Sequence, residues 1–200
     1  MSEIVVTPRP AASLLLLREA AERPEVLMGL RGAGHRFMPN RMVFPGGAVD
    51  PEDHGAACAA PLRPEVRRRL ETAADPSLPH ALGVAAAREL REGTGLTLGD
   101  PPRLDGLDYL CRAVTPASQP LRFDARFFVA GADVAAGTLA GSGELEGLRF
   151  YRVAEALALD LALVTRAVLG QLMAWRDLSP AERLARRYGH VLIDRAWRTE

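Results

Sequence analysis

The part of the sequence that decides the fold reads Arg88-Glu89-Leu90-Arg91-Glu92-Gly93-Thr94-Gly95-Leu96, and a stretch upstream of it reads Phe44-Pro45-Gly46-Gly47. Good helix formers precede the first stretch and two glycines close it, which predicts the end of a helix. Glu89 and Glu92 are three residues apart, so both carboxylates lie on one face of that helix. A glycine pair lets the backbone approach this face and present a carbonyl oxygen. Hard divalent cations prefer such oxygen ligands.

These residues together resemble the Nudix box, G-x5-E-x7-R-E-U-x-E-E-x-G-U, where U is a bulky aliphatic residue. The resemblance implies that Gly46 offers a ligating carbonyl, that Glu89 and Glu92 bind the metal, and that Arg88 orients a carboxylate. The cofactor it implies is Mg²⁺ or Mn²⁺, which neutralises charge on the diphosphate and orients the attacking water.

The chain departs from this pattern at two places. Gly93 stands where the family has its second ligating glutamate, and the segment from about 51 to 79 lies inside the box as an insertion. Asp53 takes the place of the isolated glutamate that follows the first glycine. We expect the insertion, which is polar and marked by prolines, to loop out and to tolerate excision.

The interrupted box narrows the resemblance to one branch of the superfamily. The flanking stretches Arg36-Phe37-Met38-Pro39-Asn40 and Arg122-Phe123-Asp124-Ala125-Arg126-Phe127-Phe128 resemble the branch that includes the coenzyme A diphosphatases. The resemblance covers most of the chain. It implies a Nudix-type diphosphatase that cleaves a nucleoside diphosphate linked to another moiety, with coenzyme A or its acyl thioesters as leading candidates.

Composition indicates a globular protein, because 48% of the 200 residues are hydrophobic and 25% are charged. The formal net charge is zero, so no overall field favours nucleic acid or an anionic membrane, and we expect neither as a partner. Two widely separated cysteines and the lack of a secretory signal favour a cytoplasmic protein with reduced thiols.

Hydrophobic periodicity predicts a single α/β/α layered domain over residues 1–200. The resemblance implies the Nudix fold, an α/β/α sandwich with a mixed β-sheet. The predicted strands are 11–17, 26–30, 42–44, 108–115, 122–130 and 148–153. The predicted helices are 64–74 and 79–91, followed by a C-terminal group within about 154–187 that comprises 154–159, 164–178 and 180–187. The aromatic residues Trp175 and Trp197 leave a homodimer interface possible, although Trp175 fits a core position.

Residues outside the box complete the candidate site. Glu144 lies in a loop of small residues and is a candidate metal ligand or general base; an exposed loop acid is the equal alternative. The base is left open between Glu89 and Glu144. Arg31, Arg36 and Arg41 surround the glycine-rich loop and are candidates for binding the substrate phosphates, or else form a solvated face.

The rival hypothesis is a catalytically impaired Nudix-fold module that binds a nucleotide or a protein. Gly93 favours it, because the loss of a carboxylate removes a metal ligand. The preferred hypothesis is an enzyme that acts on a small nucleotide-type substrate.

Overall fold

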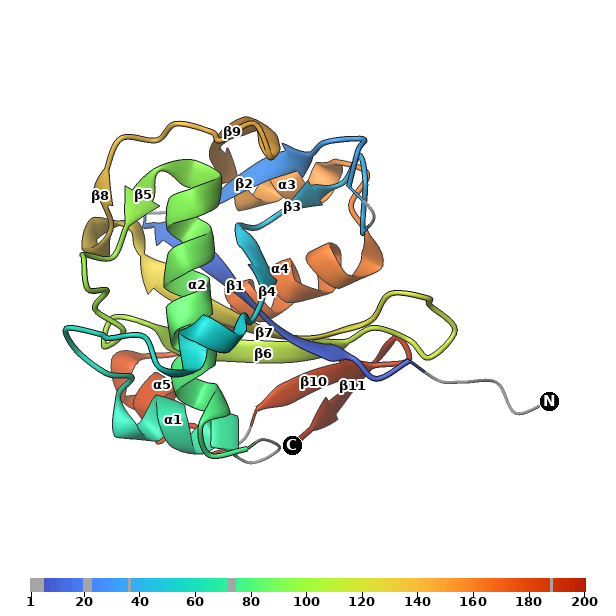
Figure 1. The fold of residues 1–200 in the computed structure, drawn as a ribbon. Coiled ribbons are helices and arrows are strands. Elements are labelled where there is room, and N and C mark those ends of the chain that lie inside the picture. Colours follow the sequence, from blue (N-terminus) through green and yellow to red (C-terminus); the bar gives the residue numbers. More distant parts are fainter. Residues whose placement is uncertain (1–5, 20–22, 36, 72–74, 188) are drawn as a thin grey trace.

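A mixed β-sheet organises the protein in the computed structural model, which describes residues 6–19, 23–35, 37–71, 75–187 and 189–200 (Figure 1). In this part of the chain nine strands form the sheet, in the order β11-β10-β6-β7-β1-β2-β3, with β4 paired to β1 and β9 paired to β2. Strand pairs β1–β7 and β6–β10 are parallel, and the other pairs are antiparallel. The strands are β1 (Arg9–Arg18), β2 (Glu25–Arg31), β3 (Met42–Val43), β4 (Gly46–Ala48), β6 (Asp108–Val114), β7 (Phe123–Gly131), β9 (Leu145–Arg152), β10 (His190–Ile193) and β11 (Ala196–Thr199).

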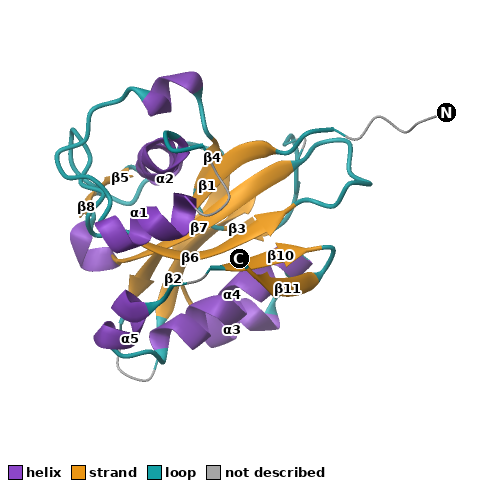
Figure 2. Cartoon of the chain, turned by 90° about the horizontal axis from the view of Figure 1, so that it is seen from below, coloured by secondary structure: helices purple, strands orange, loops and turns teal. Residues whose placement is uncertain are grey.

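Strand β1 is central because its sequence is apolar on both faces. Leu14 and Leu16 point into one core with the helix α2 (Leu78–Thr94), whereas Leu15 and Leu17 point into a second core with the helix α4 (Leu163–Arg176). A strand buried on both faces reads as a continuous apolar run rather than an alternating one. Figure 2 shows the helices α1 (Pro64–Glu71) and α2 on one side of the sheet and α3 (Val153–Ala158) and α4 on the other. The predicted α/β/α sandwich with a mixed sheet is therefore confirmed.

Helix α2 runs three residues further than the predicted range 79–91. It starts with a proline in its first turn and ends at Gly95, whose φ of 73° is left-handed and whose N–H donates to the Arg91 carbonyl. Only Gly95 ends the helix; Gly93 lies within it, with helical backbone. Carboxylates at positions 89 and 92 therefore project from an intact helical turn.

The segment 51–79 does not loop away from the domain, so this expectation was wrong. The short 3-10 helix η1 (Pro51–His54) contacts α2, and α1 packs into the α2 core through Val66 and Leu70, with Leu62 just before the helix in the same core. Val66 and Leu70 are four residues apart, which is the spacing of one helical face. Charged neighbours obscured that spacing in the sequence. That the segment is an insertion within the box stays a prediction.

The C-terminal region contains the three predicted helices, α3, α4 and α5 (Pro180–Ala185), and then a hairpin that was not predicted. Strands β10 and β11 turn at Asp194 and Arg195, both with positive φ, and β10 pairs in parallel with β6. The hairpin lacks the usual Asn-Gly turn signal and its strands have only four residues each, which explains why the sequence did not indicate it. In a second, two-stranded sheet, β5 (Leu96–Thr97) pairs with β8 (Ala136–Gly137). Strand β8 follows the η2 turn (Ala132–Val134).

No helix among the described residues is long and apolar enough to cross a membrane.

Candidate functional site

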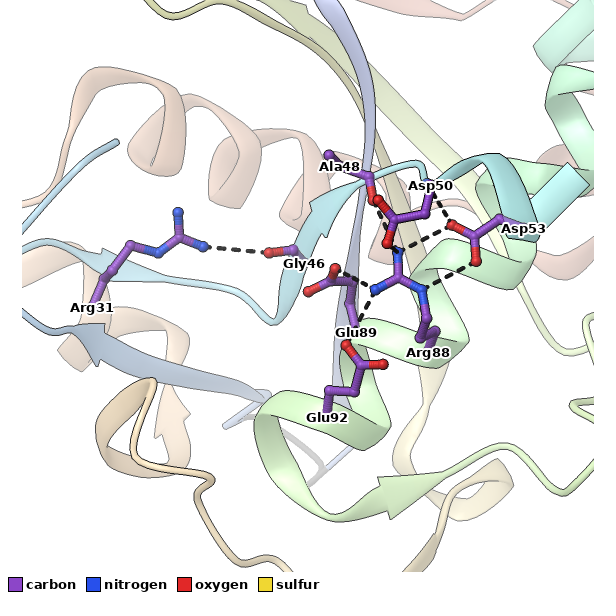
Figure 3. Close-up of polar contacts among 8 residues, drawn as sticks. All are labelled: Arg31, Gly46, Ala48, Asp50, Asp53, Arg88, Glu89 and Glu92. Atoms are coloured by element: carbon purple, nitrogen blue, oxygen red, sulfur yellow. Dashed lines mark hydrogen bonds and ion pairs between the residues drawn. The ribbon is translucent and has the colours of Figure 1, made fainter. Parts of the chain in front are cut away.

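The guanidinium of Arg88 is the centre of the polar site on α2 (Figure 3). Its Nε and Nη2 donate to the two oxygens of Asp53 at 3.1 and 3.0 Å, and Nη2 also donates to the Ala48 carbonyl at 3.0 Å. Its Nη1 donates to Glu89 at 2.8 Å and to Glu92 at 3.1 Å. One arginine thus ties the β4 edge and the η1 turn to the carboxylates of the helix.

Asp53 is buried, and it holds the η1 turn as well as Arg88. The backbone N–H of Asp50 donates to Asp53 Oδ2 at 2.8 Å, and the Asp50 carboxylate lies 3.3 Å from Arg88 Nη2. The hydrogen bond to Asp53 is the largest cause that raises the pKa of Arg88 above its ordinary value. Asp53 therefore acts on Arg88, in the place where the resembling box has its isolated glutamate.

Glu89 lies directly against the glycine edge of β4. A Cβ on Gly47 would come within 2.3 Å of Glu89 Oε1, so a side chain there would displace the Glu89 carboxylate. Burial raises the pKa of Glu89; Arg88 opposes this shift, and the charges of Glu144 and Glu92 add to it. Glu144 is therefore near enough to Glu89 for its charge to act on that carboxylate, and its role as a metal ligand or base stays a prediction.

The Gly46 carbonyl is directed away from β1. Ser13 pairs with Gly46, and the flanking bond from Leu14 N–H to the Pro45 carbonyl makes Ser13–Gly46 a pair without ladder hydrogen bonds. Arg31, at the end of β2, donates from Nη2 to this carbonyl at 3.3 Å and from Nη1 to the Phe37 carbonyl at 3.5 Å. The Nε of Arg31 is buried and has no hydrogen-bond partner among the described residues.

Of the other two candidate arginines, Arg41 forms an ion pair with Asp160, and Arg36 lies outside the described residues. Arg31 is thus the one of the two described candidates whose guanidinium is held only by carbonyls. On β7, the side chains of Asp124 and Arg126 are engaged in ion pairs within the protein. Arg126 is buried and paired with Asp124, which also binds Arg112 through both oxygens.

Gly93 leaves room for the missing side chain. A Cβ built there would meet only Leu145 Cδ1, at 3.9 Å, and Leu145 directly follows Glu144. The direction of this Cβ points a side chain towards the loop that carries Glu144. Glu146, two residues after Glu144, is exposed on β9 opposite Leu30.

A cavity of about 390 Å³ opens beside Gly46 and Gly47, and the sequence analysis did not identify it. Arg31 lies on its rim, and its other described lining residues include Phe37, Phe44, Phe123, Phe127, Ala11, Ala113, Ala125 and Leu192. The alternation of small and aromatic residues in β7 was the available signal. That alternation could indicate a cavity only once the strands next to β7 in the sheet were known.

The donors of the site fit a hard divalent cation in their chemistry. Glu89, Glu92 and the Gly46 carbonyl supply oxygens, and the bare backbone of Gly47 leaves room for the Glu89 carboxylate at this edge. No three acidic, histidine or cysteine side chains of the described residues already stand in an arrangement that could hold a metal ion. Arg88 engages one oxygen each of Glu89 and Glu92, so a cation would have to draw these carboxylates together.

Comparison with known proteins agrees with this geometry. The solved structure of a NUDIX hydrolase from Alicyclobacillus acidocaldarius superposes with a TM-score of 0.65 at 28% identity, covering 84% of this chain and 92% of that one. The MutT protein from Methanosarcina mazei Go1 gives 0.59 at 16% identity, over 88% of this chain and 100% of that one. The NUDIX domain of Shewanella oneidensis NrtR, solved with ADP ribose, gives 0.52 at 16% identity, over 84% and 88%.

In sequence, nudix hydrolase 7 of Caenorhabditis elegans is 40% identical over 88 residues, which are 44% of this chain and 22% of that protein. The chain thus matches less than a quarter of the length of this relative. No family model matches the chain. The chain has the Nudix fold, and part of it is similar in sequence to a nudix hydrolase.

Proposed function

We propose that this protein is a cytoplasmic, metal-dependent diphosphatase that hydrolyses a nucleoside diphosphate derivative, with coenzyme A or an acyl-coenzyme A as the leading substrate. The observation that carries the proposal is the Glu89 carboxylate lying against Gly47 of β4, with Glu92 joined to it through Arg88. Four carboxylates, including Asp50 and Asp53, surround the guanidinium of Arg88, so this edge has an excess of negative charge. Such an edge attracts a divalent cation.

The residues of the chain have separate tasks in this proposal. Glu89, Glu92 and the Gly46 carbonyl would hold Mg²⁺ or Mn²⁺, which neutralises charge on the phosphates and lowers the pKa of water. Arg88 fixes Glu89 relative to the β4 edge through its bonds to Asp53 and Ala48. Arg31 binds a phosphate, because a charged oxygen is a stronger acceptor than the carbonyls it contacts at 3.3 and 3.5 Å.

The proton of the attacking water goes to Glu89 or to Glu144. The pKa of Glu89 is raised towards neutral pH, and a general base works best when its pKa lies near the working pH. Glu144 lies in a loop, less constrained than the helix, and the choice between the two stays open. After attack, the two phosphate-bearing products separate.

Two observations support a nucleotide-type substrate with an apolar part. The cavity beside Gly46 has mainly apolar walls and lies within the usual size range of small-molecule sites. The NrtR domain, which has the same fold, binds ADP ribose, a nucleoside diphosphate joined to a second moiety. Coenzyme A and its thioesters also join a nucleoside diphosphate to a long second moiety.

The second candidate is a catalytically impaired Nudix-fold module that binds a nucleotide or a protein. Gly93 favours it, because no carboxylate projects from the helix at this point. The lack of a ready three-carboxylate arrangement among the described residues favours it as well.

A substrate panel decides between the two. Purified protein is incubated with coenzyme A, ADP-ribose, NADH and dinucleoside polyphosphates, with Mg²⁺, Mn²⁺ or EDTA, and phosphate-bearing products are separated by chromatography. Metal-dependent products from at least one compound, reduced in Glu92→Gln, are expected. Binding of a nucleotide without turnover of any compound would select the binding module instead.

A further inference from the structure

A row of alanines crosses the sheet beneath the cavity. Ala11 of β1 pairs with Ala125 of β7, Ala125 pairs with Ala113 of β6, and Ala113 pairs with Leu192 of β10. Directly paired residues point to the same face of a sheet, so these side chains form one continuous floor. Three methyl groups in a row leave this part of the sheet surface hollow.

Aromatic side chains rise on both sides of this floor. Phe123 and Phe127 lie two residues before and after Ala125, on the same face of β7. Phe37 contacts Phe123 edge to face at 4.7 Å between ring centroids, and Phe44 stands against Phe127 at 6.3 Å. The cavity is therefore a groove that runs across the strands, between two aromatic walls.

The two ends of the groove carry its only charged side chains among the described lining residues. Arg31 lies at the Gly46 end, and Arg195 lies at the other end, in the turn of the β10–β11 hairpin. The strands β4, β1, β7, β6 and β10 are successive neighbours, so the ends are separated by four strand spacings, about 19 Å. Arg195 is exposed and has no hydrogen-bond or ion-pair partner among the described residues.

We propose that this groove binds the moiety joined to the diphosphate, and that this moiety is an extended apolar chain ending in an anionic group that pairs with Arg195. The inference rests on the proposed function, because it takes the Gly46 end as the diphosphate site. No acidic side chain lines the groove among the described residues, so the charge there is complementary to a ligand with a negative group at each end.

The floor argues against a nucleobase as the occupant. Recognition of a base edge needs hydrogen-bonding groups within the site, and the alanine floor has none. Of the other polar side chains that line the groove, Thr115 and Gln119 lie in the loop after β6, Ser13 lies at the Gly46 end, and Thr165 donates its hydroxyl to the Met42 carbonyl. An extended apolar chain matches both the length of the groove and its apolar walls.

The test compares the decyl ester of ADP with the same ester ending in a carboxylate or in a phosphonate. Binding to the full chain is measured by calorimetry in EDTA, which prevents metal-dependent hydrolysis, and ADP itself serves as the head-group probe. The parent protein should bind an anion-terminated ester about three to ten times more tightly than the plain ester. The carboxylate and phosphonate arms identify which anionic group is preferred.

Two variants locate this preference. Arg195→Met should abolish it and leave the affinity for the plain ester unchanged, whereas Arg198→Met, a matched change on the outer strand β11, should preserve it. Ala125→Leu should weaken both esters about tenfold or more by filling the groove, without affecting ADP. Equal affinities for the plain and anionic esters in the parent, or a preference that survives Arg195→Met, would overturn the inference alone. Failure of ADP and every ester to bind, in EDTA and also with Mg²⁺ present, would remove the diphosphate site too, and with it the proposed function.

Discussion

Two arginine-centred networks lie on neighbouring helices and differ in their charge balance. Arg69 of α1 is buried and forms an ion pair with one carboxylate, Asp108, at 2.6 Å, and its other N–H groups donate to the carbonyls of Glu65 and Tyr109. Arg88 of α2 is less buried and meets four carboxylates, Asp50, Asp53, Glu89 and Glu92.

The difference separates a network with a structural role from one that we propose binds a cation. The Arg69–Asp108 pair itself carries no net charge, and Asp108 also accepts a hydrogen bond from Trp175 Nε1 at 2.8 Å. Arg69 therefore joins α1, β6 and α4 through groups that are already paired with one another. Four carboxylates around Arg88 leave a negative excess at a solvent-accessible edge, which costs stability unless a cation binds.

The largest expected effect comes from breaking the balanced network. Arg69→Met should lower the free energy of unfolding by about 3–5 kcal/mol, because it leaves the buried Asp108 charge unpaired. Urea denaturation measures the loss. Arg67→Met, which removes an exposed i,i+4 ion pair on the same helix, is the control and should cost at most about 1 kcal/mol. Equal losses in the two variants would contradict a structural role for the Arg69–Asp108 pair.

In the Arg88 network, Glu92→Gln is expected to leave stability nearly unchanged and to reduce activity. The Glu92 side chain is 51% exposed, and among the described residues its one ion pair is with Arg88, so the thermal midpoint should stay near that of the parent. Turnover on the best substrate of the panel should fall by about ten- to a hundredfold, since a charged ligand contact is lost. Glu71→Gln, an exposed acid on α1, is the control. A variant that keeps full turnover would show that the metal site lies elsewhere.

The comparison can also be tested by adding a carboxylate to the negatively charged network around Arg88. Gly93 has helical backbone and space for a Cβ, so Gly93→Glu should fold and gain about 1 kcal/mol or less from helix propensity. A carboxylate there should tighten Mn²⁺ binding, followed by electron paramagnetic resonance, by about one decade. Gly93→Gln supplies the same bulk without the charge. Unchanged Mn²⁺ affinity in a stable Gly93→Glu protein would contradict the view that this position faces the metal.

The smallest expected effect concerns the coupling between Glu144 and Glu89. Burial is the main cause of the raised pKa of Glu89, and repulsion by Glu144 adds to it. Removing that repulsion favours the charged form, so Glu144→Gln should lower the pKa of Glu89, though not to its ordinary value. Carbon-detected NMR titration of the metal-free protein measures this change. Glu146→Gln should leave the pKa of Glu89 unaltered. A lower pKa of Glu89 in that variant instead would show that Glu146, rather than Glu144, lies near Glu89.

Much of the fold was accessible from local patterns. The strands β1, β2, β6 and β7 and the helices α2 and α4 were predicted to within a few residues, because each has an apolar periodicity of its own. The insertion segment was misjudged and the β10–β11 hairpin was missed. Both depend on surfaces that the rest of the chain provides, a hydrophobic face of α2 for α1 and a free edge of β6 for β10.

The sequence by itself determined the chemistry of the box. Spacing along one helix places Glu89, Glu92 and Arg88 on a single face, and a glycine pair excludes side chains from the opposing edge, so these relations needed no knowledge of distant residues. The tertiary structure alone decided which distant groups join them. The register of four strands aligned Ala11, Ala113 and Ala125 into a groove floor, and the final hairpin brought Arg195 to its far end. Strand pairing is a long-range choice that depends on the whole sheet, whereas helical spacing is fixed by the local backbone.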